Sequence, residues 1–315
     1  MSNERFHVPN LINLCGDHFE LRVNKYCKEV STSSLERAKR TNFLSPQEVA
    51  SLPDLQLSLL ASLCYPTCDV TQLGYLTNFI LLLLHWSNRF CAASAQAFES
   101  IWKQVVRETP LDWQNRFQTH LRTHRDARLQ VNQDRQSGII PSLATYKTIR
   151  RDSSGLMMAF DYIEYVARLR LPDSVHESPQ FMEIKNTAHD IVMWANDISS
   201  YNLRQSLGDH HNLVAVIMKE EDCSLQIAVD SATDLLKAAI EKFLNLEKAL
   251  PSWSPEIDED VDRYVQGLRD WIVGSIHWIY ETGRYFDGNA EDVRTFGWVF
   301  LLPKQSTNPE AAPAL

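Results

Sequence analysis

The chain has 315 residues, of which 44% are hydrophobic and 23% are charged, which indicates a globular protein with a large core. A formal net charge of -9 and the lack of a long Lys/Arg run argue against a general nucleic-acid binder. The most hydrophobic run, residues 79–84, is too short to cross a bilayer. The opening residues lack a signal peptide's apolar core, and the six cysteines are scattered, so we expect a cytoplasmic protein in a reducing compartment.

Helical periodicity predicts an all-α chain, since only ten glycines occur and no segment shows β alternation bounded by turns. We expect a first helix over residues 16–30 and a short second one that begins at the Ser33/Glu36 capping-box pattern. Ser45, followed by proline, predicts another start, because serine caps helices and proline is tolerated at their first position. Residues 70–91 predict a long helix that is buried on nearly all sides.

The middle of the chain predicts two amphipathic helices and one interrupted helix. Residues 94–108 and 110–130 form the amphipathic pair, and the charged stretch 122–135 is expected to be a solvated face or an exposed connection. Residues 142–171 predict a long helix with a break at 152–155, because the sequence Asp-Ser-Ser-Gly favours caps and turns over helix interiors.

The remaining expected helices cover residues 179–206, 211–219, 224–250 and 255–284. No clear linker divides them, so residues 1–302 are expected to form a single all-α domain. Residues 303–315 are rich in Pro, Ser, Thr and Ala and are expected to be a disordered tail.

Polar side chains recur on one face of the 179–206 helix. Asn196, Ser200 and Arg204 are spaced by four residues, which places them on the same side. Two neutral oxygen donors suit part of a hard-cation site, whereas Arg204 repels cations and attracts phosphate. Arg150 and Arg151, just before the expected break, form a candidate anion clamp. The plain alternatives are surface arginines and a buried polar contact.

Four motifs in this order resemble the class I terpene synthases of the bacterial and fungal type. They correspond to that family's Tyr-Pro element, pyrophosphate sensor, second metal motif with its continuation, and C-terminal Arg-Tyr pair. The matching pieces are Leu63-Cys64-Tyr65-Pro66, Arg150-Arg151 with Gly155, Asn196-Asp197-Ile198-x-Ser200-Tyr201 with Gly208-Asp209, and Gly274-x-x-x-Trp278 with Arg284-Tyr285.

The resemblance implies a single-domain class I terpene synthase (isoprenoid synthase) helical bundle around a central apolar cavity. In that family magnesium ions and arginines grip a prenyl diphosphate, and the allylic cation cyclises in an aromatic-lined pocket. The implied catalytic residues at the sensor are Arg150, Ser153, Ser154 and Gly155. The implied diphosphate-binding residues are Arg150, Arg204, Arg284 and Tyr285. Candidates for the cavity lining are Phe79, Trp86, Phe160, Trp194 and Trp278.

The chain departs from the family pattern at both metal motifs. The Asp-rich motif aligns with residues 86–91, where Ser87 and Asn88 take the adjacent acid positions and Cys91 the distal one. Arg204 stands where the second motif has glutamate, so Asn88, Asn196 and Ser200 form only a degenerate metal site. A charge pair at about 4 Å is worth about 4 kcal/mol at an effective dielectric of 20, and Arg204 reverses its sign. The sequence therefore does not predict a full three-magnesium cluster, and no other cofactor is expected.

Three functions stay open. The first is an atypical sesquiterpene synthase that acts on farnesyl diphosphate or a derived sesquiterpenoid. The second is a repurposed relative that isomerises or cyclises a terpenoid by acid catalysis, or helps an amine capture a prenyl cation. The third is a non-catalytic partner of a true cyclase. A prenyl diphosphate or terpenoid is the expected ligand, with no nucleic acid or membrane. A homodimer, or association with another terpene cyclase, is left open. Asp161 and Glu164 would be acids or bases only if they faced the cavity.

Overall fold

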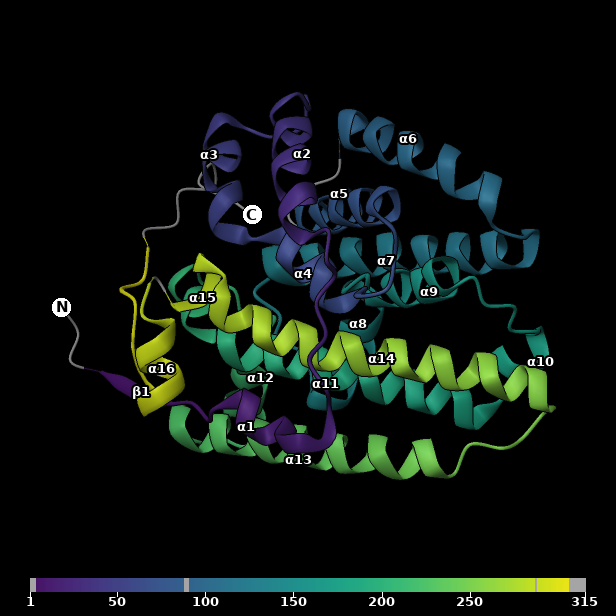
Figure 1. Cartoon of the computed structure of the whole chain (residues 1–315). Helices are drawn as coiled ribbons and strands as arrows, with labels where there is room; N and C mark the ends of the chain where they lie inside the picture. The colour runs from purple at the N-terminus through teal and green to yellow at the C-terminus, as the bar shows by residue number, and fades with distance from the viewer. Residues whose placement is uncertain (1–3, 88–90, 287, 306–315) are drawn as a thin grey trace.

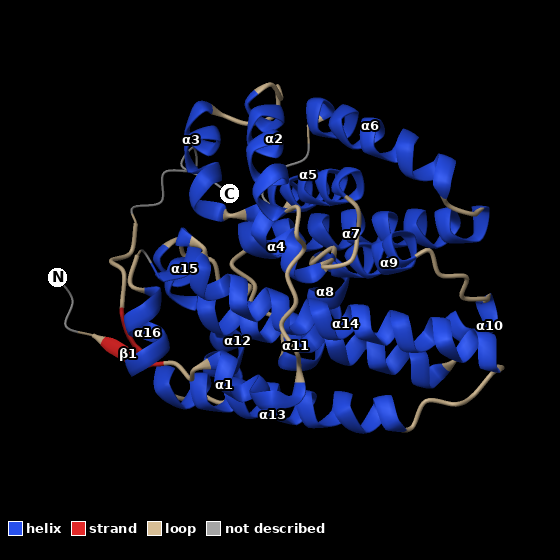
Figure 2. Ribbon diagram, viewed as in Figure 1, coloured by secondary structure: helices blue, strands red, loops and turns tan. Residues whose placement is uncertain are grey.

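The computed structural model describes residues 4–87, 91–286 and 288–305, which form a helical bundle with one small β-ribbon (Figures 1 and 2). The elements before the central break are β1 (Arg5–His7), α1 (Leu11–Cys15), the 3-10 helix η1 (Gly16–His18), α2 (Cys27–Lys39), α3 (Pro46–Leu55), α4 (Leu57–Cys64), α5 (Val70–Trp86), α6 (Ala92–Glu108), α7 (Leu111–Gln136) and α8 (Leu143–Ser153). After it come α9 (Leu156–Ala167), α10 (Asp173–His176), α11 (Pro179–Ser206), α12 (Leu213–Glu220), α13 (Leu225–Lys248), α14 (Pro255–Glu281), α15 (Gly283–Phe286), α16 (Ala290–Phe296) and β2 (Trp298–Phe300).

The long helices lie in layers across the bundle (Figure 1). Helix α11 packs against α13 on one side and against α14, α8 and α12 on others. Helix α14 also packs against α4 and α9. Helix α7 packs against α8 and α9, and α6 packs against α5. The prediction of an all-α fold is confirmed. Among the described residues, the only paired strands are β1 and β2, an antiparallel pair in which Phe6 faces Val299, and the sequence analysis did not predict them.

Two expected helix starts have opposite outcomes. The Ser45 start is confirmed, because Ser45 Oγ accepts the N–H of Glu48 at 3.2 Å and the Glu48 carboxylate accepts the N–H of Ser45 at 2.7 Å. The Ser33 start is wrong. Helix α2 runs through Ser33, whose hydroxyl donates to the Val30 carbonyl inside the helix at 3.2 Å. A capping-box pattern alone therefore did not decide where a helix begins.

The first expected helix, over residues 16–30, is also wrong. The short turn η1 forms at residues 16–18, the chain then runs without helix to residue 26, and residues 27–30 are the start of α2. The Asn24 side chain holds this segment by donating to the carbonyls of Tyr65 and Cys68, at 3.1 and 2.8 Å. Such contacts across some forty residues outweigh a weak local helical preference.

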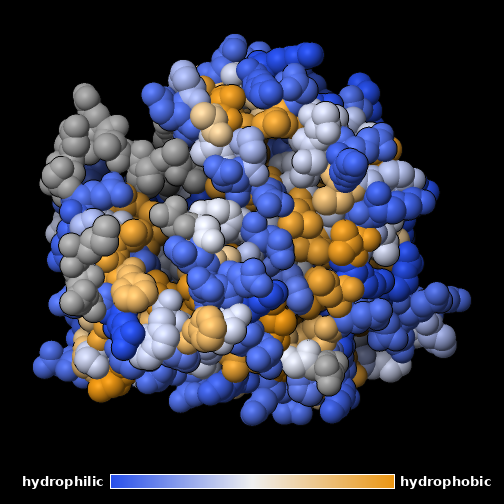
Figure 3. Space-filling view, turned by 60° about the vertical axis from the view of Figure 1, so that its left-hand side comes forward, coloured by the Kyte–Doolittle hydropathy of each residue, from blue (hydrophilic) through white to orange (hydrophobic). Residues whose placement is uncertain are grey.

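The end of the described chain contacts the last residue of α11. The backbone N–H of Gln305 donates to the Ser206 carbonyl at 2.8 Å, and residues 306–315 of the expected tail lie outside the described residues. Hydrophilic side chains cover much of the face in Figure 3, with smaller hydrophobic patches between them. Across the described part of the chain, no helix combines the length and the apolar character that a membrane span requires.

Candidate functional site

The break predicted at residues 152–155 is confirmed and separates α8 from α9. Helix α8 ends at Ser153, and Gly155 has a φ of 77°, in the left-handed region that favours glycine. A Cβ atom at residue 155 would also lie only 2.8 Å from Leu83 Cδ2 on α5. Both the backbone angle and the close approach of α5 therefore require glycine here.

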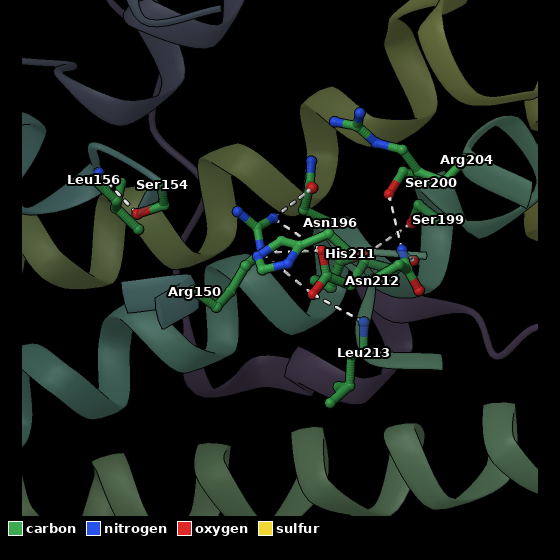
Figure 4. Close-up of polar contacts among 12 residues, drawn as sticks. Arg150, Ser154, Leu156, Asn196, Ser199, Ser200, Arg204, His211, Asn212 and Leu213 are labelled. Atoms are coloured by element: carbon green, nitrogen blue, oxygen red, sulfur yellow. Dashed lines mark hydrogen bonds and ion pairs between the residues drawn. The ribbon is translucent and has the colours of Figure 1, made fainter. Parts of the chain in front are cut away.

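Ser154 and Arg151 connect this break to α11 through polar contacts. Ser154 Oγ lies 2.7 Å from His189 Nε2 and accepts the N–H of Leu156 at 3.0 Å (Figure 4). Arg151 makes a bidentate ion pair with Asp190, with Nε 2.8 Å from Oδ1 and Nη2 2.5 Å from Oδ2. Burial lowers the pKa of His189, so its imidazole is uncharged near neutral pH. Arg151 thus has a carboxylate partner and holds two helices together.

Arg150 is bound to the second motif on α11. Its Nη2 lies 2.8 Å from Asp197 Oδ1 and 3.1 Å from Asn196 Oδ1 (Figure 4). The Tyr146 hydroxyl makes a short hydrogen bond to the same carboxylate. Burial by itself would lower the pKa of Arg150, but the charges of Asp197 and Tyr146 and the hydrogen bonds to them together outweigh burial, and the pKa is raised. The Asn196 amide also donates to the Tyr285 hydroxyl at 2.7 Å, which brings the C-terminal motif to the same place.

Arg204 and Ser200 lie further along the same face of α11 (Figure 4). Arg204 Nη1 is 2.9 Å from Asp209 Oδ2, and Arg135 of α7 reaches the same carboxylate at 2.7 Å. Burial raises the pKa of Asp209, but the two guanidinium groups outweigh it and lower the pKa to about 2. The Ser200 hydroxyl accepts from the Asn212 side chain at 3.4 Å. One carboxylate therefore serves two arginines.

Arg128 brings another guanidinium from α7. It is 8% exposed, and one Nη donates to the carbonyl of Ser87 at the end of α5. Burial, and then the charges of Arg135, Arg204 and Arg150, lower its pKa to about 9. Its Nε has no hydrogen-bond partner among the residues that the structure describes. Arg128 thus lies near like charges, and none of the ion pairs among the described residues gives it a carboxylate partner.

Arg284 of α15 completes the group. Its guanidinium lies 5.9 Å from the ring centre of Tyr285, and within the described chain its Nη1 has no hydrogen-bond partner. Burial lowers the pKa of Arg284, and the charge of Arg204 lowers it further. The Tyr285 ring packs edge-on against Trp278, with ring centres 5.8 Å apart.

We call these five arginines the arginine cluster: Arg128, Arg135, Arg150, Arg204 and Arg284. The carboxylates bonded to it in the described residues are Asp197 and Asp209, so the cluster carries an excess of positive charge. Guanidinium groups form paired, charge-assisted hydrogen bonds to phosphate oxygens. The arrangement is therefore suited to binding a polyanion.

Comparison with known proteins identifies the family of the chain. Residues 89–242 match the family model described as terpene synthase family 2, C-terminal metal binding. The chain is 34% identical to sesquiterpene synthase Agr1 of Cyclocybe aegerita, over 95% of this chain and 93% of the relative. It is 32% identical to sesquiterpene synthase 1 of Postia placenta, over 95% of this chain and 96% of the relative. The chain belongs to the class I terpene synthase family. The crystal structure of a-eudesmol synthase has the same fold, with a TM-score of 0.75 at 20% identity, covering 83% of this chain and 96% of that one.

The family model is described as metal-binding, but the residues present here do not fit a magnesium cluster. Ser87 Oγ bonds to the Leu83 carbonyl of its own helix at 3.0 Å, and Asn88 lies outside the described residues. Asn196 Oδ1 accepts from Arg150, and Arg204 puts a cation where the second motif has its acid. Within the described ranges, no group of three or more His, Cys, Asp and Glu side chains could hold a metal ion. Magnesium needs several oxygen ligands, usually with carboxylates among them, and this donor set does not provide them.

The five aromatic side chains predicted to line the cavity are all buried. Each contacts another aromatic ring, a lysine ammonium group or a hydrogen-bond acceptor. Three of them contact aromatic rings or side chains of neighbouring helices: Phe79 with Tyr162 at 4.8 Å, Trp86 with Phe98 at 5.4 Å, and Phe160 with Trp271 at 6.1 Å. Lys147 lies 5.3 Å from the Trp194 ring, and Trp278 Nε1 donates to the Leu55 carbonyl at 2.9 Å. Of these rings, Trp278 is linked to the arginine cluster, through Tyr285.

Two residues of the cluster were missed from the sequence. Residues 122–135 were expected to be a solvated face or an exposed connection, but α7 buries Arg128, and the Arg135 guanidinium bonds to buried Asp209. The signal was present in the spacing. Positions 124, 128, 131 and 135 recur at intervals of three or four and share one side of a helix. The density of charge on the rest of α7 hid this stripe.

Proposed function

We propose that this protein is a sesquiterpene-synthase-type enzyme that binds a prenyl diphosphate, of the farnesyl class, through the arginine cluster. The observation that carries the proposal is Arg204, which adds a guanidinium on the face that bears Asn196 and Ser200. The named relatives support the substrate class, since both are sesquiterpene synthases. The cluster would supply positive charge where the family pattern has metal ligands.

Such a cluster can assist ionisation in a defined way. When the allylic C–O bond breaks, its electron pair stays on the diphosphate, which gains negative charge. Preorganised guanidinium groups stabilise that developing charge more than the ground state and so lower the barrier. Arg128 and Arg284 suit this task, because Arg128 is buried, Arg284 is half-buried, and each has a nitrogen atom without a hydrogen-bond partner among the described residues.

A second candidate is a protein that binds a prenyl diphosphate or terpenoid without ionising it. It is favoured by the ion pairs of Arg150 with Asp197 and of Arg204 with Asp209, which neutralise two of the five cations. A repurposed step on a terpenoid, or association with a true cyclase, belongs to this candidate.

The test is to incubate the pure protein with farnesyl diphosphate, once with magnesium and once with EDTA. Released diphosphate and volatile products are measured, and binding of inorganic diphosphate in EDTA is followed by calorimetry. We expect binding in EDTA that Arg204→Gln weakens and Arg125→Gln leaves unchanged, since Arg125 is an exposed arginine on the outer side of α7. Binding without products selects the second candidate, and no binding at millimolar diphosphate rejects both anion proposals.

Arg204→Glu provides a further check on the metal motifs. Restoring this acid alone should not create magnesium-dependent activity, because the Asp-rich positions also lack their carboxylates. Turnover that appears with magnesium in this variant would show that the alignment of Ser87 and Asn88 is wrong.

A further inference from the structure

His124 lies one turn before Arg128 on the buried side of α7. The residue is 1% exposed, and neither ring nitrogen makes a hydrogen bond of normal geometry in the described part of the protein, although the backbone carbonyls of Asp152 and Ser153 lie close enough to influence its pKa. A buried polar group without a partner is costly, so such a group in a native protein calls for an explanation. The anion chemistry proposed above provides one.

The position of His124 is fixed by three elements that meet at the site. A Cβ atom at Gly155 would lie 3.4 Å from its Cε1 atom, so the ring lies against the α8–α9 break. Leu83 of α5 approaches the same point, at 2.8 Å from that Cβ position. On its own helix, Arg128 follows after four residues and reaches the Ser87 carbonyl at the end of α5. The imidazole is therefore enclosed at the edge of the arginine cluster.

The electrostatics of the ring follow from these neighbours. Burial lowers the pKa of His124, the charge of Arg128 lowers it further, and the backbone carbonyls of Asp152 and Ser153 act in the opposite direction, leaving a pKa of about 4. His120, one turn earlier on α7, is paired with Asp161, at 2.6 Å. In the free protein, His124 is thus an uncharged ring near a cation at neutral pH.

We propose that His124 is a member of the anion site that takes up a proton when diphosphate binds and donates an N–H to one of its oxygen atoms. This rests on the proposed function. The bound anion offsets the charge of Arg128 and adds negative charge of its own, and both effects favour the imidazolium. The protonated ring has two N–H donors, one for a carbonyl of α8 and one for the anion. Diphosphate thereby adds one more cation to the site that holds it.

The test reads the ring directly in the wild-type protein. Histidine labelled with ¹³C at Cε1 is titrated by NMR with and without saturating inorganic diphosphate, in EDTA, and Gln substitution at residue 124 assigns the signal. We expect a pKa of about 4 in the free protein. Since opposite charge within 4–6 Å shifts a pKa by about 1–3 units, we expect a rise of that size with diphosphate.

His189 is the matched control. It is also fully buried with a lowered pKa, but its Nε2 bonds to Ser154 and its neighbours are the Arg151–Asp190 pair. Its signal should move much less on adding diphosphate. Calorimetry gives an independent readout. If the pKa of His124 rises by about two units, diphosphate should bind about tenfold more tightly at pH 5 than at pH 7, after subtraction of the pH dependence that His124→Gln shows.

The outcomes separate the two proposals. Diphosphate binding with a raised His124 pKa supports both. Binding with an unchanged His124 signal overturns this inference and leaves the arginine site standing. No diphosphate binding by the wild-type protein overturns the anion site and this inference with it.

Discussion

The two halves of α7 carry buried polar networks that differ in their balance of charge. In the first half, Arg116 Nη2 lies 2.9 Å from Glu164 Oε2, and His120 Nδ1 lies 2.6 Å from Asp161 Oδ2. Both carboxylates come from α9 and are at least 95% buried. Asp161 and Glu164, considered from the sequence as acids or bases, are thus each engaged by a side chain of α7.

In the second half of α7, cations face cations. Burial lowers the pKa of Arg128, and the charges of the nearby Arg135, Arg204 and Arg150 lower it further. The carboxylate of Asp209 is shared between two of them. Placing like charges together in a protein interior is unfavourable, so the first half of α7 contributes to stability, whereas the second half has the charge that the anion site proposed above requires. The difference between the halves can be tested by substitution.

The largest expected effect is on stability, from Arg116→Met in the first half. Glu164 would then be buried without its guanidinium partner, and loss of one member of a buried pair costs about 3–5 kcal/mol. Urea unfolding measures the loss, and adding Glu164→Gln should recover part of it. Diphosphate affinity of the folded variant should be unchanged. Weaker diphosphate binding in Arg116→Met would contradict the division of α7 into two halves.

Arg128→Met in the second half should give the opposite pattern. Removing a cation that is repelled by its neighbours should leave the free energy of unfolding unchanged or raise it. Diphosphate affinity should fall about 30-fold, since a hydrogen bond to a charged group contributes about 1.5–3 kcal/mol. Calorimetry and urea unfolding measure the two quantities, with Arg125→Met as the surface control. A large loss of stability together with unchanged affinity would make Arg128 a structural residue.

The sequence predicted the all-α fold and the helix break, because periodicity and glycine chemistry act locally. Arg150, Asn196, Arg204 and Tyr285 were placed together by the family resemblance. The sequence could not show which carboxylates pair with which arginines. That pairing depends on contacts such as Arg135 with Asp209, which are 74 residues apart in the chain.

The predictions for the segment before α2 and for the buried side of α7 were wrong for a related reason. Asn24 is fixed by carbonyls that the later α4–α5 connection presents. Arg128 looks like a solvated residue in sequence, because charged residues are rarely buried. Its burial follows from the packing of α7 against the neighbouring helices of the bundle, which no local pattern records.

Asp209→Asn tests how far the shared carboxylate offsets the positive charge around the second half of α7. The folded-state pKa of Asp209 is about 2, below its ordinary value of 3.8. Its contribution to stability, about 2 kcal/mol, is therefore present above about pH 4 and lost as the pH falls towards 2. In Asp209→Asn, the free energy of unfolding at pH 7 should drop by about that amount, and its fall between pH 4 and pH 2 should flatten. Identical acid profiles for the two proteins would show that Asp209 does not balance the arginines.

The smallest expected difference is between a variant and its control at Gly155, the point where α5, the α8–α9 break and α7 meet. Gly155→Ala places a Cβ at a φ of 77° and 2.8 Å from Leu83 Cδ2. Gly138→Ala is the matched control, since its φ is 65° and nothing lies within 4 Å of the added atom. Both variants bear the cost of a left-handed alanine, of about 1–2 kcal/mol. Gly155→Ala should lose about 1 kcal/mol more, because Leu83 has to move. An equal loss in the free energy of unfolding for both variants would mean that Leu83 of α5 moves at no cost. The packing around His124 beside the arginine cluster would then be looser than the contacts indicate.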